Sequence, residues 1–106
     1  MSFVNLEKVE EKEIVPGFRA RFVHSTNNTM AFWRVEEGAA LPEHSHPHEQ
    51  MTTVLEGTFE LTVGEVTKRI RSGEVVVVPP DVKHTGKALT TCRLLDVFYP
   101  VRQEYK

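Results

Sequence analysis

Three histidines, a glutamate and a glutamine lie within the seven residues 44–50, which read HSHPHEQ. Neutral imidazole is a common ligand for transition metals, and carboxylate and amide oxygens can complete such a site. Residues i and i+2 of an extended strand project to the same face, so His44 and His46 can present two imidazoles side by side. The stretch from Gly38 to Gly57, which contains this cluster, therefore predicts a metal-binding centre.

A third imidazole must come from elsewhere in the chain, and His84 is the candidate. It follows the apolar run VVVVPP, which Pro79 and Pro80 should end because proline cannot donate to a strand ladder. A short turn after the two prolines can aim His84 back into the mouth of a barrel. Pro47 should help to hold His46 extended, because the residue before a proline is biased toward the β region.

Gln50 is the expected fourth ligand, and Thr52 can return to the same interior. An alternative is that Gln50 only hydrogen-bonds His46. Three imidazoles and an amide are all neutral, so a divalent ion among them would keep its full charge and favour an anionic ligand in its open positions. Ligand type does not select one metal, and Ni, Zn, Mn, Fe and Cu all remain candidates. We expect His48 and Glu49 to face outward.

The elements that must position these residues are predicted to be short β-strands. Apolar and polar residues alternate with the period of a half-buried strand, and glycines interrupt the pattern at the spacing typical of an all-β sandwich or barrel. The predicted strands cover residues 18–25, 30–37, 50–57, 58–64, 66–73, 75–80 and 90–100. A closed or rolled antiparallel barrel is the economical architecture, since closure removes unpaired edges.

Three details of this pattern can be checked individually. The run 75–80 is apolar throughout and is expected to be buried on both faces. The loop STNNT should join two antiparallel strands, with Asn27 and Asn28 tolerating positive φ. In the last strand, Asp96 shares a face with Phe98. The order of the first 16 residues is ambiguous, because their apolar period fits neither helix nor strand.

Composition limits the class of protein. A chain of 106 residues is expected to form one domain, residues 1–106, and its net charge of -2 suggests neither a nucleic-acid partner nor a polybasic membrane patch. Cys92 is the only cysteine, so no intrachain disulfide is possible. No signal peptide and no apolar run of roughly 20 residues is evident, and a cytoplasmic protein with a small-molecule partner is expected.

Two spaced motifs make the sequence resemble the cupins. The first cupin motif has a glycine, His-x-His, a glutamate and a second glycine, and the chain matches it at Gly38, His44, His46, Gln50 and Gly57. The second has a glycine, a proline, a histidine and an asparagine, matched at Gly73, Pro79 and His84. The resemblance implies an all-β, single-domain cupin with an antiparallel β-barrel or jelly-roll fold.

Three positions depart from the cupin motifs. Gln50 stands in place of the usual glutamate, Asp81 in place of a glycine, and Ala88 in place of the asparagine. The last two affect the turn and leave the proposed ligands intact. His44, His46, Gln50 and His84 therefore remain the predicted metal ligands.

The carboxy-terminal part sharpens this resemblance. The runs HSHPHEQMTTVLEGTFELTVG, VVVVPPDVKHTGKALT and LLDVFYPVR look like the small cupins of pectin and alginate breakdown, which convert 4,5-unsaturated monouronates to linear 4-deoxy-5-keto uronates. The catalytic residues of that family fall here on Asp96, Phe98 and Arg102. The resemblance thus implies a non-redox enzyme of carbohydrate metabolism that binds a small anionic sugar.

The residues leave simpler readings open. Asp96 could be a carboxylate held by backbone donors or by Arg21 or Arg34, Phe98 could serve only as core packing, and Arg102 could be a solvated tail residue. We also expect His24 to be structural.

Two other functions also fit the metal site. One is an Fe(II)-dependent dioxygenase using the same ligands, and the other is a non-catalytic module that binds a small acid. Small cupins are commonly dimers, and the N-terminal arm, residues 1–16, has enough apolar side chains to pair with a partner subunit. A homodimer is therefore expected.

Overall fold

The protein folds into ten β-strands and two short 3-10 helices. The computed structural model describes residues 1–106. The strands are β1 (Lys12–Val15), β2 (Phe18–His24), β3 (Thr29–Val35), β4 (Ala40–His44), β5 (Glu49–Glu56), β6 (Thr58–Val63), β7 (Val66–Arg71), β8 (Val75–Val78), β9 (His84–Ala88) and β10 (Cys92–Tyr99). The 3-10 helices are η1 (Leu6–Lys8) and η2 (Gln103–Tyr105). None of the helices is long and apolar enough to cross a membrane.

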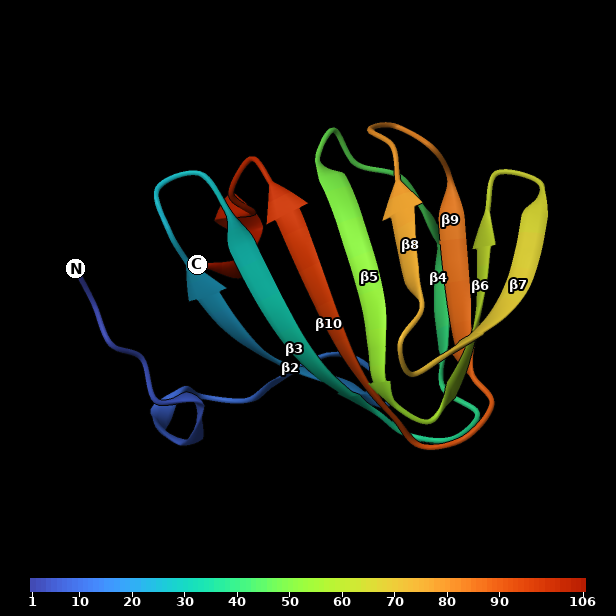
Figure 1. Cartoon of the computed structure of the whole chain (residues 1–106), viewed down its shortest axis with the longest axis horizontal. Coiled ribbons are helices and arrows are strands. Elements are labelled where there is room, and N and C mark those ends of the chain that lie inside the picture. Colours follow the sequence, from blue (N-terminus) through green and yellow to red (C-terminus); the bar gives the residue numbers. More distant parts are fainter.

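Two antiparallel sheets face each other and enclose the core (Figure 1). The first has six strands in the order β1-β2-β3-β10-β5-β8, and the second has four in the order β4-β9-β6-β7. The predicted all-β, antiparallel fold is confirmed. β10, which is last in sequence, lies between β3 and β5 at the centre of the larger sheet.

The alternation predicted for the central strands is observed, with every second residue facing the core. In β2 and β3 the buried residues alternate with partly or fully exposed ones, and Phe18, Ala20 and Trp33 are among those inside. In β10 the buried set includes Leu94, Asp96 and Phe98, so one carboxylate lies in an otherwise largely apolar row. The core face of β10 therefore carries two of the three predicted catalytic residues, Asp96 and Phe98.

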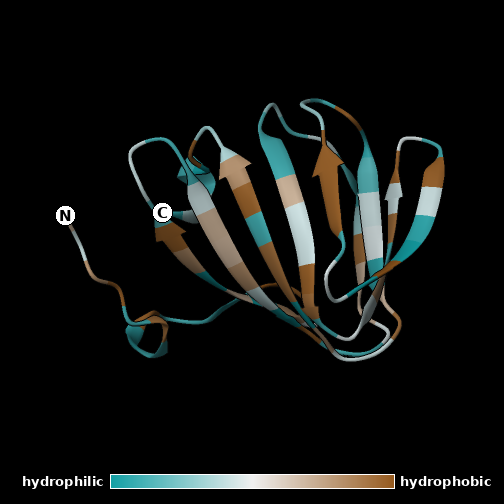
Figure 2. Ribbon diagram, in the orientation of Figure 1, coloured by the Kyte–Doolittle hydropathy of each residue, from teal (hydrophilic) through white to brown (hydrophobic).

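The prediction that the run 75–80 is buried on both faces is wrong. β8 includes only Val75–Val78 and lies at the edge of the larger sheet, where it pairs with β5 alone. Val75 is 62% exposed and Val77 is 57% exposed, whereas Val78 is fully buried. Figure 2 shows β8 as one of the most hydrophobic strands, although its outer face is open to solvent.

Positive φ occurs in a different turn from the one in which it was expected. The loop after β2 joins two antiparallel strands as predicted, but neither Asn27 nor Asn28 has positive φ. The one non-glycine residue with positive φ is Asp81, at 63°, where the cupin motif has glycine. Its backbone N–H donates to the carbonyl of His46 at 2.8 Å, which ties the loop before His84 to the histidine segment.

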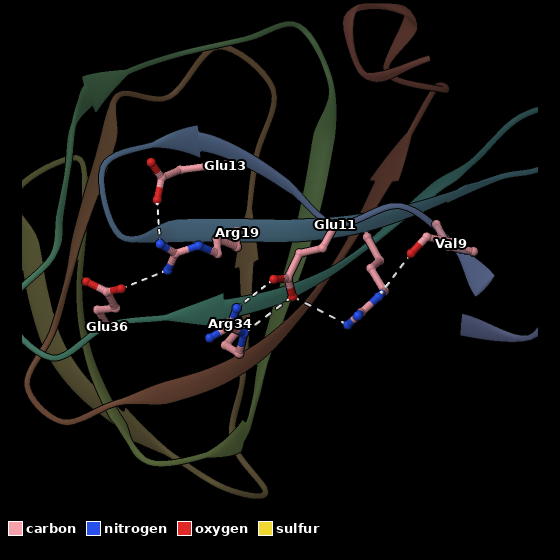
Figure 3. A network of polar contacts seen from close by, with 7 residues as sticks. Val9, Glu11, Glu13, Arg19, Arg34 and Glu36 are labelled. Carbon is pink, nitrogen blue, oxygen red and sulfur yellow. Dashed lines mark hydrogen bonds and ion pairs between the residues drawn. The ribbon is translucent and has the colours of Figure 1, made fainter. Parts of the chain in front are cut away.

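The N-terminal segment forms the edge strand of the larger sheet. β1 pairs with β2 of the same chain, and ion pairs reinforce this edge. Figure 3 shows Glu11 between Arg34 and a second arginine, with the Arg34 Nη2 to Glu11 Oε1 distance at 2.6 Å. Arg19 bridges Glu13 and Glu36 in the same view.

Substitution of Asp81 tests the turn that positions His84. Aspartate tolerates the left-handed region better than most residues, but glycine adopts it without a steric penalty. We expect Asp81→Gly to be at least as stable as the wild type, and Asp81→Val to lose about 1–2 kcal/mol of unfolding free energy. Asp81→Asn should be close to neutral. Chemical denaturation measures all three, and a stable Asp81→Val would contradict this account of the turn.

Candidate metal centre

The three predicted histidines meet at one end of the space between the two sheets. His44 ends β4, His84 begins β9, and the two residues are paired in the smaller sheet. His46 lies in the loop between β4 and β5. One nitrogen of each ring lies within 4.8 Å of the others. The structure therefore brings together residues from two distant segments, as a metal site requires.

Backbone carbonyls orient all three rings in the same way. In each ring Nδ1 lies 2.9 Å from a carbonyl oxygen: His44 from Pro42, His46 from His48, and His84 from Val82. A carbonyl only accepts, so each Nδ1 carries the proton and donates it. The Nε2 atoms are left with their lone pairs, which is the usual arrangement for metal-binding histidines.

The His84 ring gives a direct test of whether an ion fits. Its Nε2 is buried and has no hydrogen-bond partner. Burial lowers the pKa of His84 from 6.5 to about 4, so the ring is neutral at neutral pH. A buried acceptor without a donor is rare in native proteins and needs an explanation. A divalent cation between the three rings would satisfy it, and this donor set fits a transition metal.

The Gln50 side chain also faces the three-histidine cluster. It is 7% exposed, and its Oε1 lies 3.0 Å from Nε2 of His46. Both atoms are acceptors, because the proton of His46 is on Nδ1. Two ligand atoms at about 2.1 Å from one ion and at right angles would be about 3 Å apart. The distance therefore suits two ligands of a shared cation, and it supports Gln50 as the fourth ligand.

Asp96 lies deeper in the core and is held by two side-chain donors. The Thr52 hydroxyl donates to Oδ1 at 2.6 Å, and Trp33 Nε1 donates to Oδ2 at 2.9 Å. Burial raises the pKa of Asp96 from 3.8 to about 6, although both hydrogen bonds oppose the shift. The alternative partners Arg21 and Arg34 are bonded to Glu11 instead.

Arg102 turns inward after β10. It is 8% exposed, and its guanidinium carbon lies 4.7 Å from the ring centre of Phe98 and 4.5 Å from that of Tyr105. Its Nε donates to Glu104. The reading of Arg102 as a solvated tail residue is therefore wrong, because two aromatic faces and a carboxylate hold it at the cavity.

One cavity of about 270 Å³ brings together His44, Gln50 and the three predicted catalytic residues, whereas His46 and His84 do not line it. Its wall combines metal-binding, acidic, basic and aromatic side chains: Ile14, Val15, Trp33, Leu41, Pro42, His44, Gln50, Asp96, Phe98, Arg102 and Tyr105. Such a mixture of an apolar wall with a few convergent polar groups is typical of small-molecule sites.

Sequence reasoning missed the roles of Trp33 and Tyr105. Trp33 falls within the predicted strand 30–37, but the sequence gave no sign that its indole would donate to Asp96. Tyr105 belongs to η2 and stacks on Phe22 with ring centres 4.3 Å apart. No periodic signal marks so short an element.

The remaining histidines lie outside the three-histidine cluster. His24 contacts the Thr29 hydroxyl at 2.8 Å and the Tyr105 carbonyl at 3.2 Å, which anchors the C-terminal segment. This agrees with the structural role expected for it. His48 is half-buried and Glu49 is exposed.

Metal binding should stabilise the folded protein measurably. An ion at about 100 times its Kd adds about 2.7 kcal/mol to the free energy of unfolding, which raises the Tm by roughly 10–20 °C for a domain of this size. Thermal unfolding after dialysis against chelator, with and without added Ni²⁺, Zn²⁺ or Mn²⁺, measures this shift. His84→Ala should abolish it and the control His48→Ala should keep it. An undiminished shift in His84→Ala would contradict the site.

The pH dependence of Asp96 can be measured in metal-free protein. Its folded pKa of about 6 lies above the ordinary 3.8, so the unfolded chain releases this proton first as pH rises. The free energy of unfolding that Asp96 contributes therefore falls as pH rises between these two values. Asp96→Asn should lack this pH dependence. Carbon-detected NMR of the Asp96 carboxyl should give a midpoint near 6. A midpoint near 3.8 would contradict its burial.

Comparison with known proteins places the chain in a family. Residues 31–98 match the model described as the cupin domain. Protein SchB of Streptomyces halstedii is 33% identical over 61 residues, which is 57% of this chain and less than half, 44%, of SchB.

Two solved structures superpose closely on the whole chain. An RmlC-like cupin from Shewanella frigidimarina has a TM-score of 0.94 and 28% identity, over 100% of this chain and 96% of that one. KdgF from Halomonas sp. has a TM-score of 0.93 and 24% identity, over 100% of this chain and 99% of that one. The matched domain, the fold and the two histidine motifs agree, and the chain belongs to the cupin family.

Proposed function

We propose that this cupin converts 4,5-unsaturated monouronates from pectin or alginate breakdown to linear 4-deoxy-5-keto uronates. The observation that carries the proposal is the meeting of His44, Gln50, Asp96, Phe98 and Arg102 in one cavity. The last three are the residues that the sequence resemblance to the uronate-converting cupins implicates. The structural likeness to KdgF is compatible with this reading and bears on the fold.

The metal would be held by His44, His46, Gln50 and His84. When bound, a divalent ion supplies Lewis-acid stabilisation to substrate oxygens. All four ligands are neutral, so the ion's charge is not reduced by the protein. That charge suits an anionic substrate.

Arg102 is the group that would bind the uronate carboxylate. Guanidinium and carboxylate form paired, charge-assisted hydrogen bonds. The rings of Phe98 and Tyr105 already hold the guanidinium in place, so little side-chain entropy is lost on binding. Phe98 also gives the sugar ring an apolar wall and keeps water away from Asp96.

Asp96 would move the proton. The reaction adds a proton to C4 and a water oxygen to C5 of the enol ether, and the resulting hemiketal opens to the 5-ketone. Asp96 can give its proton to C4 and take one from the adding water, so no net proton or electron is exchanged. Its pKa of about 6 lies close to neutral pH, where proton transfer by a carboxyl group is most effective.

Loss of the conjugated alkene absorbance tests the activity directly. Unsaturated galacturonate and the alginate-derived unsaturated uronate should both be tried with metal-loaded protein. Asp96→Asn should lower the rate by about 10²–10⁴-fold, which is typical for loss of a general acid or base. Asp81→Asn, whose side chain does not line the cavity, is the matched control.

Two further measurements separate this activity from other cupin chemistry. Chelator should abolish the reaction, and no oxygen should be consumed, because the conversion is not a redox reaction. Oxygen uptake with a small acid would instead point to a dioxygenase. Equal rates in wild type and Asp96→Asn would refute the role of Asp96.

We also propose that the protein is a homodimer. Met1 and Phe3 in the N-terminal arm are almost fully exposed, and so are large parts of Leu55, Val75 and Val77 on the larger sheet. Burying such apolar surface against a second copy would be favourable. Light scattering should give about twice the chain mass of 12.1 kDa, and a mass of 12.1 kDa would refute the dimer.

A further inference from the structure

A chain of side-chain hydrogen bonds connects Asp96 in the core to the proposed metal position. The Thr52 hydroxyl lies 2.6 Å from Asp96 Oδ1, and Gln50 Nε2 lies 2.9 Å from the same hydroxyl. At the far end, Gln50 Oε1 lies 3.0 Å from His46 Nε2. All four residues are buried, so water does not compete for these contacts.

The chain of bonds has a fixed direction. Trp33 Nε1 donates to one oxygen of Asp96 and the Thr52 hydroxyl donates to the other. A hydroxyl has a single proton, so the Thr52 oxygen can then only accept from its second neighbour. That neighbour must be the NH₂ group of Gln50. The amide oxygen of Gln50 is consequently turned toward His46.

The opposite orientation of the amide would suit His46 better in the absence of an ion. His46 Nε2 carries a lone pair, because Nδ1–H donates to the His48 carbonyl. An NH₂ group of Gln50 could donate to that lone pair. Instead two acceptors face each other, and only a cation between them makes this favourable. The preference for the amide oxygen thus comes from Thr52 and Asp96.

We propose that Thr52 is a positioning residue: with Asp96 it fixes the Gln50 amide so that the oxygen faces the metal. This inference rests on the proposed metal function. It gives Asp96 a second role, because the same carboxylate that would move the proton also sets the direction of the hydrogen bonds.

The proposal explains why glutamine replaces the glutamate of the cupin motif. A carboxylate at position 50 would place an acceptor against the Thr52 oxygen, whose only proton is given to Asp96. Two acceptors would then compete for one proton in a buried site, which is costly. Gln50 and Asp96 therefore form a matched pair, joined through Thr52.

Substitution of Thr52 tests the positioning role without changing any charge. Competition with a coloured chelator measures Ni²⁺ and Zn²⁺ affinity of each purified variant. Thr52→Val keeps the shape but removes the hydroxyl, and should weaken metal binding by about 10–100-fold, as is usual when a partner of a ligand is lost. Thr52→Ser keeps the hydroxyl and should bind as the wild type does.

Thr53→Val is the matched control. Thr53 is the next residue on β5, and its hydroxyl donates to the Glu74 carbonyl at 3.0 Å, away from the cavity. Its metal affinity should be unchanged. Equal affinity of Thr52→Val and Thr53→Val would overturn the positioning role.

A pair of substitutions tests the direction of the hydrogen bonds. Asp96→Asn can donate to Thr52, whose proton then goes to Gln50 and turns the amide, so metal affinity should fall although Asp96 touches no metal. Adding Gln50→Glu reverses both bonds of Thr52 consistently: the amide NH₂ introduced at position 96 donates to Thr52, and the Thr52 hydroxyl donates to the carboxylate introduced at position 50. Trp33, which can only donate, still donates to the amide oxygen at position 96. The double variant should recover metal affinity, and its net charge equals that of the wild type.

The outcomes separate the positioning role from the metal site itself. A wild-type protein that binds neither ion would overturn the metal centre and the proposed function. Wild-type binding with a double variant no tighter than Asp96→Asn would overturn only the positioning role. If Thr52→Val does not fold by circular dichroism, the double variant decides the question.

Discussion

A carboxylate buried between two sheets must be hydrogen-bonded, and the arrangement of this site depends on how Asp96 meets that requirement. Trp33 and Thr52 supply the donors. The bond from Thr52 then fixes what Gln50 can do, and Gln50 faces the histidines. The acid-base group and the metal ligands are thus parts of one connected structure rather than separate features of a cavity.

The fold supplies the geometry for this connection. β5 and β10 are neighbours in the larger sheet, and Thr52 lies directly opposite Asp96 in their register, while Gln50 lies opposite Phe98. Trp33 comes from β3 on the other side of β10. His84 comes from the smaller sheet through a turn that depends on the unusual backbone of Asp81. Strands therefore hold most groups of the site, with His46 and Arg102 on the connecting segments. Sites built on strands are positioned more precisely than sites on loops.

Much of this could be predicted from the sequence. Period-2 alternation predicted the central strands and the shared face of Asp96 and Phe98, and motif spacing predicted His44, His46 and His84 as a group. The partners of Asp96 could not be predicted, because strand order and register decide which side chains face each other. The exposed face of β8 was missed because an apolar run does not reveal whether a strand lies at an edge. The inward turn of Arg102 depends on a 3-10 helix too short to leave a pattern.

The most direct test is a crystal structure of the metal-loaded protein, with the ion located by its anomalous scattering. The account predicts one ion bonded to Nε2 of His44, His46 and His84 and to Oε1 of Gln50 at about 2.1 Å, with the Gln50 amide nitrogen on Thr52. An ion bound elsewhere, or a Gln50 side chain turned with its nitrogen toward His46, would contradict it.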